Sequence, residues 1–83
     1  MNNNDVKQII YGAIRNRDRY QNEITEDTNL IEDLGFSSID MIELIYFLEE
    51  KCNIQFSFED LDIEILMIVG KLVELVLSKT TKQ

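Results

Sequence analysis

The sequence predicts an all-α fold, a small bundle of three longer helices and one short helix. Apolar residues recur at spacings of three and four in three separate stretches, which is typical of helices with one buried face. Two Ser-x-x-Asp motifs, at Ser37 and Ser57, have the spacing of a capping box, and the chain contains no proline. At 83 residues the chain can build one hydrophobic core and is too short to form two separate domains, so we expect a single domain over residues 1–83.

The first helix is expected to begin after Asp5, a candidate N-cap, and to end near Arg17. Arg15 and Arg17 near its C-terminus suit the helix dipole. We interpret this helix as core-forming and assign it no site. Its apolar residues at helical spacing are Val6, Ile9, Ile10, Ala13 and Ile14.

A long polar connection follows, from Asp18 to Phe36. Unstructured loops of this length are uncommon in compact domains, so we expect its apolar side chains to hold it against the helices. These side chains are Ile24, Leu30, Ile31 and Leu34. Its acidic residues do not form a calcium loop, because a glycine at the sixth position, Gly35, would place Leu30 at the first.

The second helix is expected to begin at Ser38. Ser37 and Asp40 form a capping box, in which the Ser37 hydroxyl accepts a backbone N–H and Asp40 reaches back. Phe36 and Met41 then occupy the positions of a hydrophobic staple. With Ser37 used as the cap, Ser38 lies on the first turn with its hydroxyl unengaged, beside N–H groups that suit an attached phosphate. On these residues alone, the alternative is that Ser37 is an ordinary helix cap and Ser38 is the residue after it, with no functional role.

This helix should run to about Cys52. Because each residue turns it by about 100°, its two sides can be told apart. The expected core face holds Met41, Ile42, Ile45, Leu48 and Cys52. The opposite face holds Asp40, Glu43, Phe47 and Glu50. An aromatic ring among carboxylates is a candidate docking surface, although single exposed apolar residues are also ordinary. We expect Cys52 to be a small buried hydrophobe.

The C-terminal part of the chain is expected to hold the short helix and the last long one. Ser57 and Asp60 repeat the capping motif and predict a short helix from Phe58 to Leu61. The final segment returns to helical spacing and should close the bundle as one helix. Its apolar residues are Ile65, Ile68, Val69, Leu72, Val73 and Val76.

Composition limits the chemistry that the chain can perform. It has no histidine and one cysteine, which removes most metal sites, Ser-His and Cys-His pairs and an internal disulfide. We therefore expect a protein that is not an enzyme and binds no metal. No apolar run reaches the length of a membrane span, and the polar residues 1–4 do not begin a signal peptide, so we expect a cytoplasmic protein.

The formal net charge of −8 is unevenly distributed. Residues 1–22 and 65–83 each carry a net charge of +2, whereas residues 23–64 hold thirteen acidic residues against Lys51 alone, a net of −12. An acidic centre repels nucleic acid and attracts basic protein surfaces, so we expect basic proteins as partners. An acidic surface that only keeps a small protein soluble is the alternative.

The stretch from Asp33 to Leu44 reads Asp-Leu-Gly-Phe-Ser-Ser-Ile-Asp-Met-Ile-Glu-Leu. It resembles the acyl carrier protein signature, Asp-Leu-Gly-x-Asp-Ser-Leu followed by Asp, two variable positions and Glu-Leu. The similarity covers most of the chain and continues through Leu48–Glu50, a weaker Ile54–Leu61 and Val69–Glu74. The resemblance implies an acyl-carrier-like helical bundle with 4′-phosphopantetheine, derived from coenzyme A, attached covalently to Ser38. Ser37 departs from the usual aspartate; serine caps a helix about as well, but a partner contact that needs a charge there would be lost.

By the same resemblance, the protein is a carrier that holds acyl intermediates as thioesters and delivers them to enzymes of fatty-acid, polyketide or specialised lipid biosynthesis. The implied partners are a phosphopantetheinyl transferase, an acyl- or aminoacyl-loading ligase, and synthases and transferases with basic docking patches. They would meet the acidic face of the second helix, at Asp40, Glu43, Tyr46, Phe47, Glu49 and Glu50. A free-standing aminoacyl or peptidyl carrier of a nonribosomal peptide-type pathway and an unmodified acidic adaptor remain as alternatives. We expect a monomer.

Overall fold

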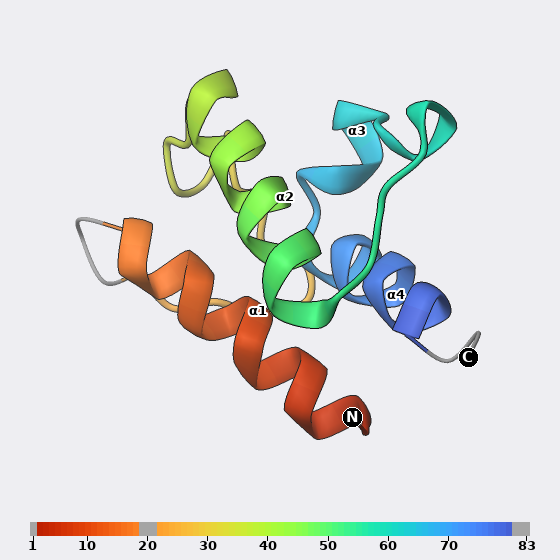
Figure 1. Cartoon of the computed structure of the whole chain (residues 1–83). Coiled ribbons are helices and arrows are strands. Elements are labelled where there is room, and N and C mark those ends of the chain that lie inside the picture. Colours follow the sequence, from red (N-terminus) through yellow and green to blue (C-terminus); the bar gives the residue numbers. More distant parts are fainter. Residues whose placement is uncertain (1, 19–21, 81–83) are drawn as a thin grey trace.

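The structure, a computed structural model, describes residues 2–18 and 22–80, and these residues form a helical fold (Figure 1). Arg19 and Lys82, which contribute to the basic ends of the chain, lie outside the described residues. The elements are α1 (Asn3–Arg17), α2 (Ser38–Cys52), a 3₁₀ turn η1 (Phe58–Asp60), α3 (Ile63–Leu66) and α4 (Val69–Thr80). The prediction of an all-α fold with three longer helices and a short one is confirmed. Within the described residues no helix is long and apolar enough to cross a membrane.

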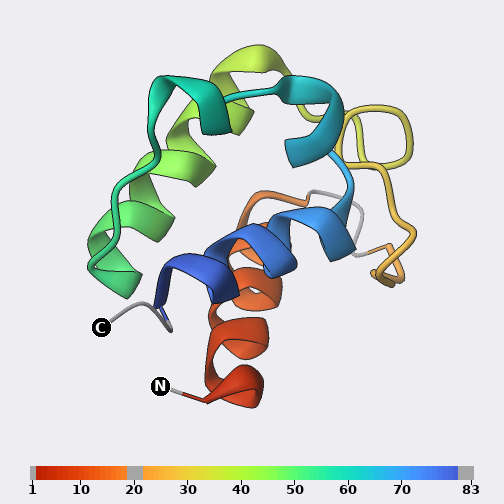
Figure 2. The same cartoon turned by 90° about the vertical axis from the view of Figure 1, so that its right-hand side faces the viewer.

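Helix α1 packs against both α2 and α4, and α3 packs against α4 (Figures 1 and 2). The predicted core face of α1 is confirmed: Ile9 is partly buried and the other four predicted apolar residues are buried. The predicted N-cap was wrong, because Asn2 is the cap and Asp5 is the third residue of the helix. The Asp5 N–H donates to Asn2 Oδ1 (2.9 Å) and the Asn2 N–H donates to Asp5 Oδ2 (3.3 Å). Asparagine is itself a strong N-cap, and the acid three residues later completes a capping box.

The connection between α1 and α2 is held by its apolar side chains, as predicted. Ile24, Leu30 and Leu34 are buried and Ile31 is partly buried. Backbone hydrogen bonds also join this connection to the start of α4, and we call them the main-chain bridge. They run from the Leu30 N–H to the Met67 carbonyl (2.7 Å), from the Val69 N–H to the Thr28 carbonyl (3.0 Å), and from the Gly70 N–H to the Glu26 carbonyl (2.9 Å).

The prediction of one continuous helix from Ile65 onward was wrong. The chain forms α3 and then turns through Met67 and Ile68 before α4 begins. The main-chain bridge explains the break, because Met67 accepts from the connection and Ile68 pairs with Asn29 in an isolated antiparallel bridge. Ile65, expected on the buried face, is exposed. The buried residues of α4 are as predicted: Val69, Leu72, Val73 and Val76.

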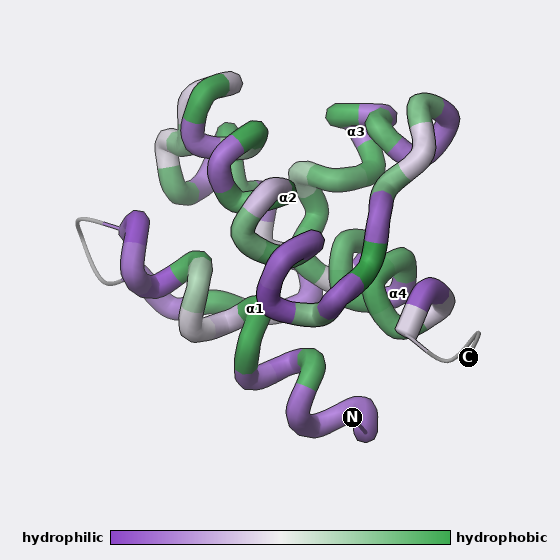
Figure 3. Tube along the Cα trace, viewed as in Figure 1, coloured by the Kyte–Doolittle hydropathy of each residue, from purple (hydrophilic) through white to green (hydrophobic). Residues whose placement is uncertain are grey.

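The core face of α2 was predicted only in part. Met41, Leu48 and Cys52 are buried as expected and Ile45 is partly buried, but Ile42 is 51% exposed. Leu44, which had been assigned to neither face, is fully buried. Apolar segments recur between polar ones along α2 (Figure 3), and there are more of them than one buried face requires, so the sequence is compatible with more than one buried face. Packing against α1 and the rest of the core selects the face through Met41, Leu44, Leu48 and Cys52.

The short helix predicted from Phe58 to Leu61 is confirmed as the 3₁₀ turn η1, which ends one residue earlier. Ser57 is its N-cap, and the Asp60 carboxylate accepts the Ser57 N–H (2.7 Å). Asp60 also pairs with Lys79 near the end of α4, at 2.6 Å between Oδ2 and Nζ. The connection after α2 is thereby tied to the C-terminal helix.

Candidate functional site

The start of α2 is built by a glycine turn and a capping box. Gly35 has a φ of 75°, a left-handed conformation that glycine adopts without steric cost. Two residues later Ser37 is the N-cap: its Oγ accepts the Asp40 N–H (3.1 Å), while Asp40 Oδ2 accepts the Ser37 N–H (2.9 Å) and its hydroxyl (3.0 Å). The predicted capping box is confirmed. Phe36 and Met41 are both buried, as the predicted staple requires.

Ser38 is the first residue of α2 and is exposed. Within the part of the chain that the structure describes, no hydrogen bond engages its hydroxyl. The N–H groups of Ser38 and Ile39 belong to the first helical turn, which leaves them without an acceptor inside the helix. Of the two adjacent serines, Ser37 is therefore committed to the cap and Ser38 offers a free hydroxyl beside unsatisfied donors.

Arg17, the last residue of α1, lies against the acidic side of α2. Its Nη1 is 2.6 Å from Glu43 Oε1 and 3.7 Å from Asp40 Oδ1. Arg17 also lines a groove beside the cap and a second hollow that contains Phe47. The acidic side of α2 predicted for docking thus has its own cation at the border with α1. Sequence reasoning missed this contact, and the basic charge of the N-terminal segment was the only signal for it.

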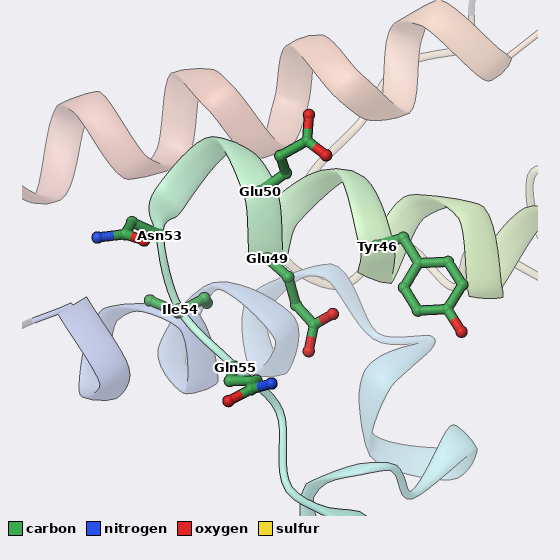
Figure 4. Close-up of a pocket in the computed structure, with 6 residues that line it drawn as sticks. All are labelled: Tyr46, Glu49, Glu50, Asn53, Ile54 and Gln55. Atoms are coloured by element: carbon green, nitrogen blue, oxygen red, sulfur yellow. The ribbon is translucent and has the colours of Figure 1, made fainter.

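The other predicted docking residues of α2 do not form one continuous face. Tyr46, Glu49 and Glu50 line a pocket with the turn after the helix (Figure 4). Glu49 points toward the connection after α2, where its Oε2 accepts the Phe56 N–H (2.8 Å), and Glu50 projects on the opposite side of the helix (Figure 4). Glu49 is half-buried and holds the chain turn, whereas Tyr46 and Glu50 are exposed.

An exposed apolar stripe, which we define as Ile39, Ile42 and Tyr46, extends along α2 from the residue after Ser38. Its members follow spacings of three and four, so they lie on one side of the helix. All three are at least half exposed. The spacing of apolar residues did not distinguish this stripe from the buried face of α2. The only signal for it was that α2 has more apolar residues than one core face requires.

The one thiol of the chain is unsuited to carry a reactive group. Cys52 is buried, as predicted, and burial raises the pKa of its thiol. A raised pKa keeps the thiol protonated, and the protonated form is a poor nucleophile. Cys52 is therefore a poor candidate for a reactive group.

Comparison with known proteins decides the family. Residues 13–76 match the model of a family described as a phosphopantetheine attachment site. This chain belongs to the acyl carrier protein family.

Relatives of this acyl carrier protein cover most of its length. It is 35% identical to an acyl carrier protein of Buchnera aphidicola subsp. Acyrthosiphon pisum, over 94% of this chain and 91% of the relative. It is 33% identical to that of Wolinella succinogenes, over 83% and 84% of the two chains. It is 39% identical to that of Clostridium perfringens, over 75% and 79%. An acyl carrier protein is a carrier and not an enzyme, and its cofactor is 4′-phosphopantetheine.

The residues at the start of α2 fit the phosphodiester of this cofactor. A phosphodiester needs an accessible hydroxyl as its attachment point, and Ser38 has one. Its negative charge is favoured at a helix N-terminus, where free N–H groups and the helix dipole point outward. Asp40 brings an opposing negative charge, which Arg17 partly offsets.

Proposed function

We propose that this acyl carrier protein bears its phosphopantetheine on Ser38. The observation that carries the proposal is the contrast between two adjacent serines, of which Ser37 is bonded within the capping box and Ser38 is exposed and unengaged. A transferase that modifies one serine at a helix start needs such a hydroxyl. The capping box holds the first turn in place, so Ser38 is presented in a fixed position.

We further propose that the protein holds acyl intermediates for enzymes of fatty-acid, polyketide or specialised lipid biosynthesis. When bound, the cofactor supplies a terminal thiol that takes up an acyl group as a thioester. The names of the relatives, all acyl carrier proteins, favour an acyl cargo over an aminoacyl or peptidyl one. The chain itself contributes the attachment point and the recognition surface.

Partner enzymes are proposed to meet α2 through its exposed residues. The acidic centre of the sequence favours encounter with basic patches on a phosphopantetheinyl transferase, a loading ligase and synthases. The surface proposed for these contacts comprises Asp40, Glu43, Tyr46, Phe47, Glu49 and Glu50. Glu49 contributes least to it, because its carboxylate is bound to the Phe56 N–H. We propose that the protein acts as a monomer in these encounters.

Intact mass spectrometry tests the attachment residue. The full chain is incubated with coenzyme A and a broad-specificity phosphopantetheinyl transferase, as wild type, Ser37→Ala and Ser38→Ala. We expect wild type and Ser37→Ala to gain one phosphopantetheinyl group and Ser38→Ala to gain none. Ser37→Ala is the matched control, because it removes the neighbouring hydroxyl and leaves the proposed acceptor.

The outcome also separates the carrier from an unmodified acidic adaptor. Gain of the group by Ser38→Ala would disprove the attachment residue. Failure of several transferases to modify the folded wild-type chain would favour the adaptor, which should bind its partners equally well with alanine at position 38.

A further inference from the structure

The acidic side of α2 is paired with a positive charge from the same chain, the guanidinium of Arg17. Its guanidinium donates to Glu43 Oε1 at 2.6 Å and lies 3.7 Å from Asp40 Oδ1. The three side chains are neither buried nor fully exposed: Arg17 is 30% exposed and Glu43 is 54% exposed. The contact is therefore accessible from solvent, and another cation can reach the same carboxylates.

This arrangement changes what an approaching basic protein meets near Ser38. Arg17 places a positive charge beside the carboxylates of Glu43 and Asp40, so it reduces the negative charge that this part of the surface presents. Arg17 already holds Glu43 Oε1, so an arginine of a partner can bind both oxygens of Glu43 only by displacing Arg17 from Oε1. The displaced guanidinium then lies next to an incoming cation, which adds like-charge repulsion.

We propose that Arg17 competes with the basic side chains of partner proteins for Glu43 and Asp40, and so weakens docking that relies on charge alone. This inference rests on the proposed function, in which partners dock on α2. Its consequence is selectivity: a partner that also contacts the exposed apolar stripe retains an attraction that Arg17 does not affect. A partner with only a basic patch meets a partly neutralised surface.

The size of the effect follows from the exposure of the pair. Partly exposed ion pairs are worth up to about 1 kcal/mol, which corresponds to a change in affinity of about two- to fivefold. The effect is electrostatic between accessible groups, so it should shrink as salt screens it.

Binding of a tri-arginine peptide at low salt tests the competition without requiring modification of the carrier. The chains compared are Arg17→Gln and Arg15→Gln, which lose the same charge two positions apart on α1. Arg15 is exposed and also lies in the last turn, without an ion pair in the described residues. We expect Arg17→Gln to bind the peptide about two- to fivefold more tightly than Arg15→Gln, with the difference lost at high salt.

The double variant Arg17→Gln, Glu43→Gln identifies the carboxylate involved. It should lose most of the gained affinity, because the carboxylate that Arg17 releases is then absent. Circular dichroism of each variant checks that the helices are intact. Substitution of glutamine, which keeps much of the length of arginine, limits loss of packing in the groove beside the cap.

Equal peptide affinities for Arg17→Gln and Arg15→Gln would overturn the proposal, and so would weaker binding by folded Arg17→Gln. The rate of modification by the transferase provides the matching test with a protein partner. Arg17→Gln should be modified with a higher kcat/KM than Arg15→Gln at low salt. Absence of modification in every chain, together with the expected peptide affinities, would contradict the carrier function and leave the competition standing.

Discussion

Replacement of the two serines at the start of α2 should affect stability very differently. Ser37→Ala removes the Oγ that accepts the Asp40 N–H and the hydroxyl that donates to Asp40 Oδ2. The bond from the Ser37 N–H to Asp40 Oδ2 remains available. The Asp40 N–H and carboxylate that lose these bonds can bond to water instead, so no buried donor is left unsatisfied.

The expected cost of Ser37→Ala is therefore that of a typical N-cap, about 1 kcal/mol. For a domain of this size such a loss lowers Tm by roughly 4–8 °C. Ser38→Ala should change the free energy of unfolding by less than about 0.5 kcal/mol, because its hydroxyl is exposed and makes no bond. Alanine also has the higher helix propensity.

Thermal and urea unfolding of the unmodified chain at pH 7, followed by circular dichroism, measures both changes. Ser37→Asn is the control, because asparagine keeps a capping oxygen and places no second negative charge beside Asp40 Oδ2. Its stability should stay within about 0.5 kcal/mol of wild type. Equal losses in Ser37→Ala and Ser38→Ala would refute the assignment of Ser37 as the cap.

Three further substitutions, in α1 and α4, should change the stability of the protein. Gly12→Ala should raise the free energy of unfolding by about 0.5–1 kcal/mol in urea titrations, because a Cβ there meets nothing within 4 Å. Gly70→Ala should instead lower it, since its Cβ would lie 3.0 Å from the Glu26 carbonyl oxygen; an equal gain would show that the connection yields. Hydrogen bonds to the Asp60 carboxylate, from Lys79 first and then from the Ser57 N–H and hydroxyl, lower the pKa of Asp60 to about 2. The stability that the ionised carboxylate contributes is therefore complete above pH 4 and is lost as pH falls toward 2. Lys79→Ala should cost up to about 1 kcal/mol at pH 7 and much less near pH 2, and a pH-independent cost would contradict an ionic contact.

Features set by neighbouring residues could be predicted from the sequence. The capping boxes at Ser37 and Ser57 join residues three apart, and the end of α1 at Arg17 follows from the helical pattern. The free hydroxyl of Ser38 follows from the same local geometry. The N-cap of α1 was missed because Asp5 was interpreted as the cap, whereas Asn2 gives a complete box with it.

Features set by distant residues could not be predicted. Ile42 and Leu44 are both apolar, and only the position of the neighbouring helices determines which of them is buried. The break before α4 depends on backbone atoms of the connection, which no side-chain pattern reports. Arg17 meets Glu43 across 26 positions of the chain, so its contact depends on how α1 lies against α2.

The main-chain bridge has a mechanical consequence for the proposed attachment point. The Phe36 N–H donates to the Leu30 carbonyl (3.0 Å), and the Leu30 N–H donates to the Met67 carbonyl (2.7 Å). Consecutive backbone bonds thus run from just before α4 to the residue preceding the cap. A flexible tether fixed at Ser38 would therefore begin at a helix end that backbone hydrogen bonds join to both halves of the chain. The effective concentration of its cargo at a docked enzyme would then depend on the length of the tether and on where the enzyme docks.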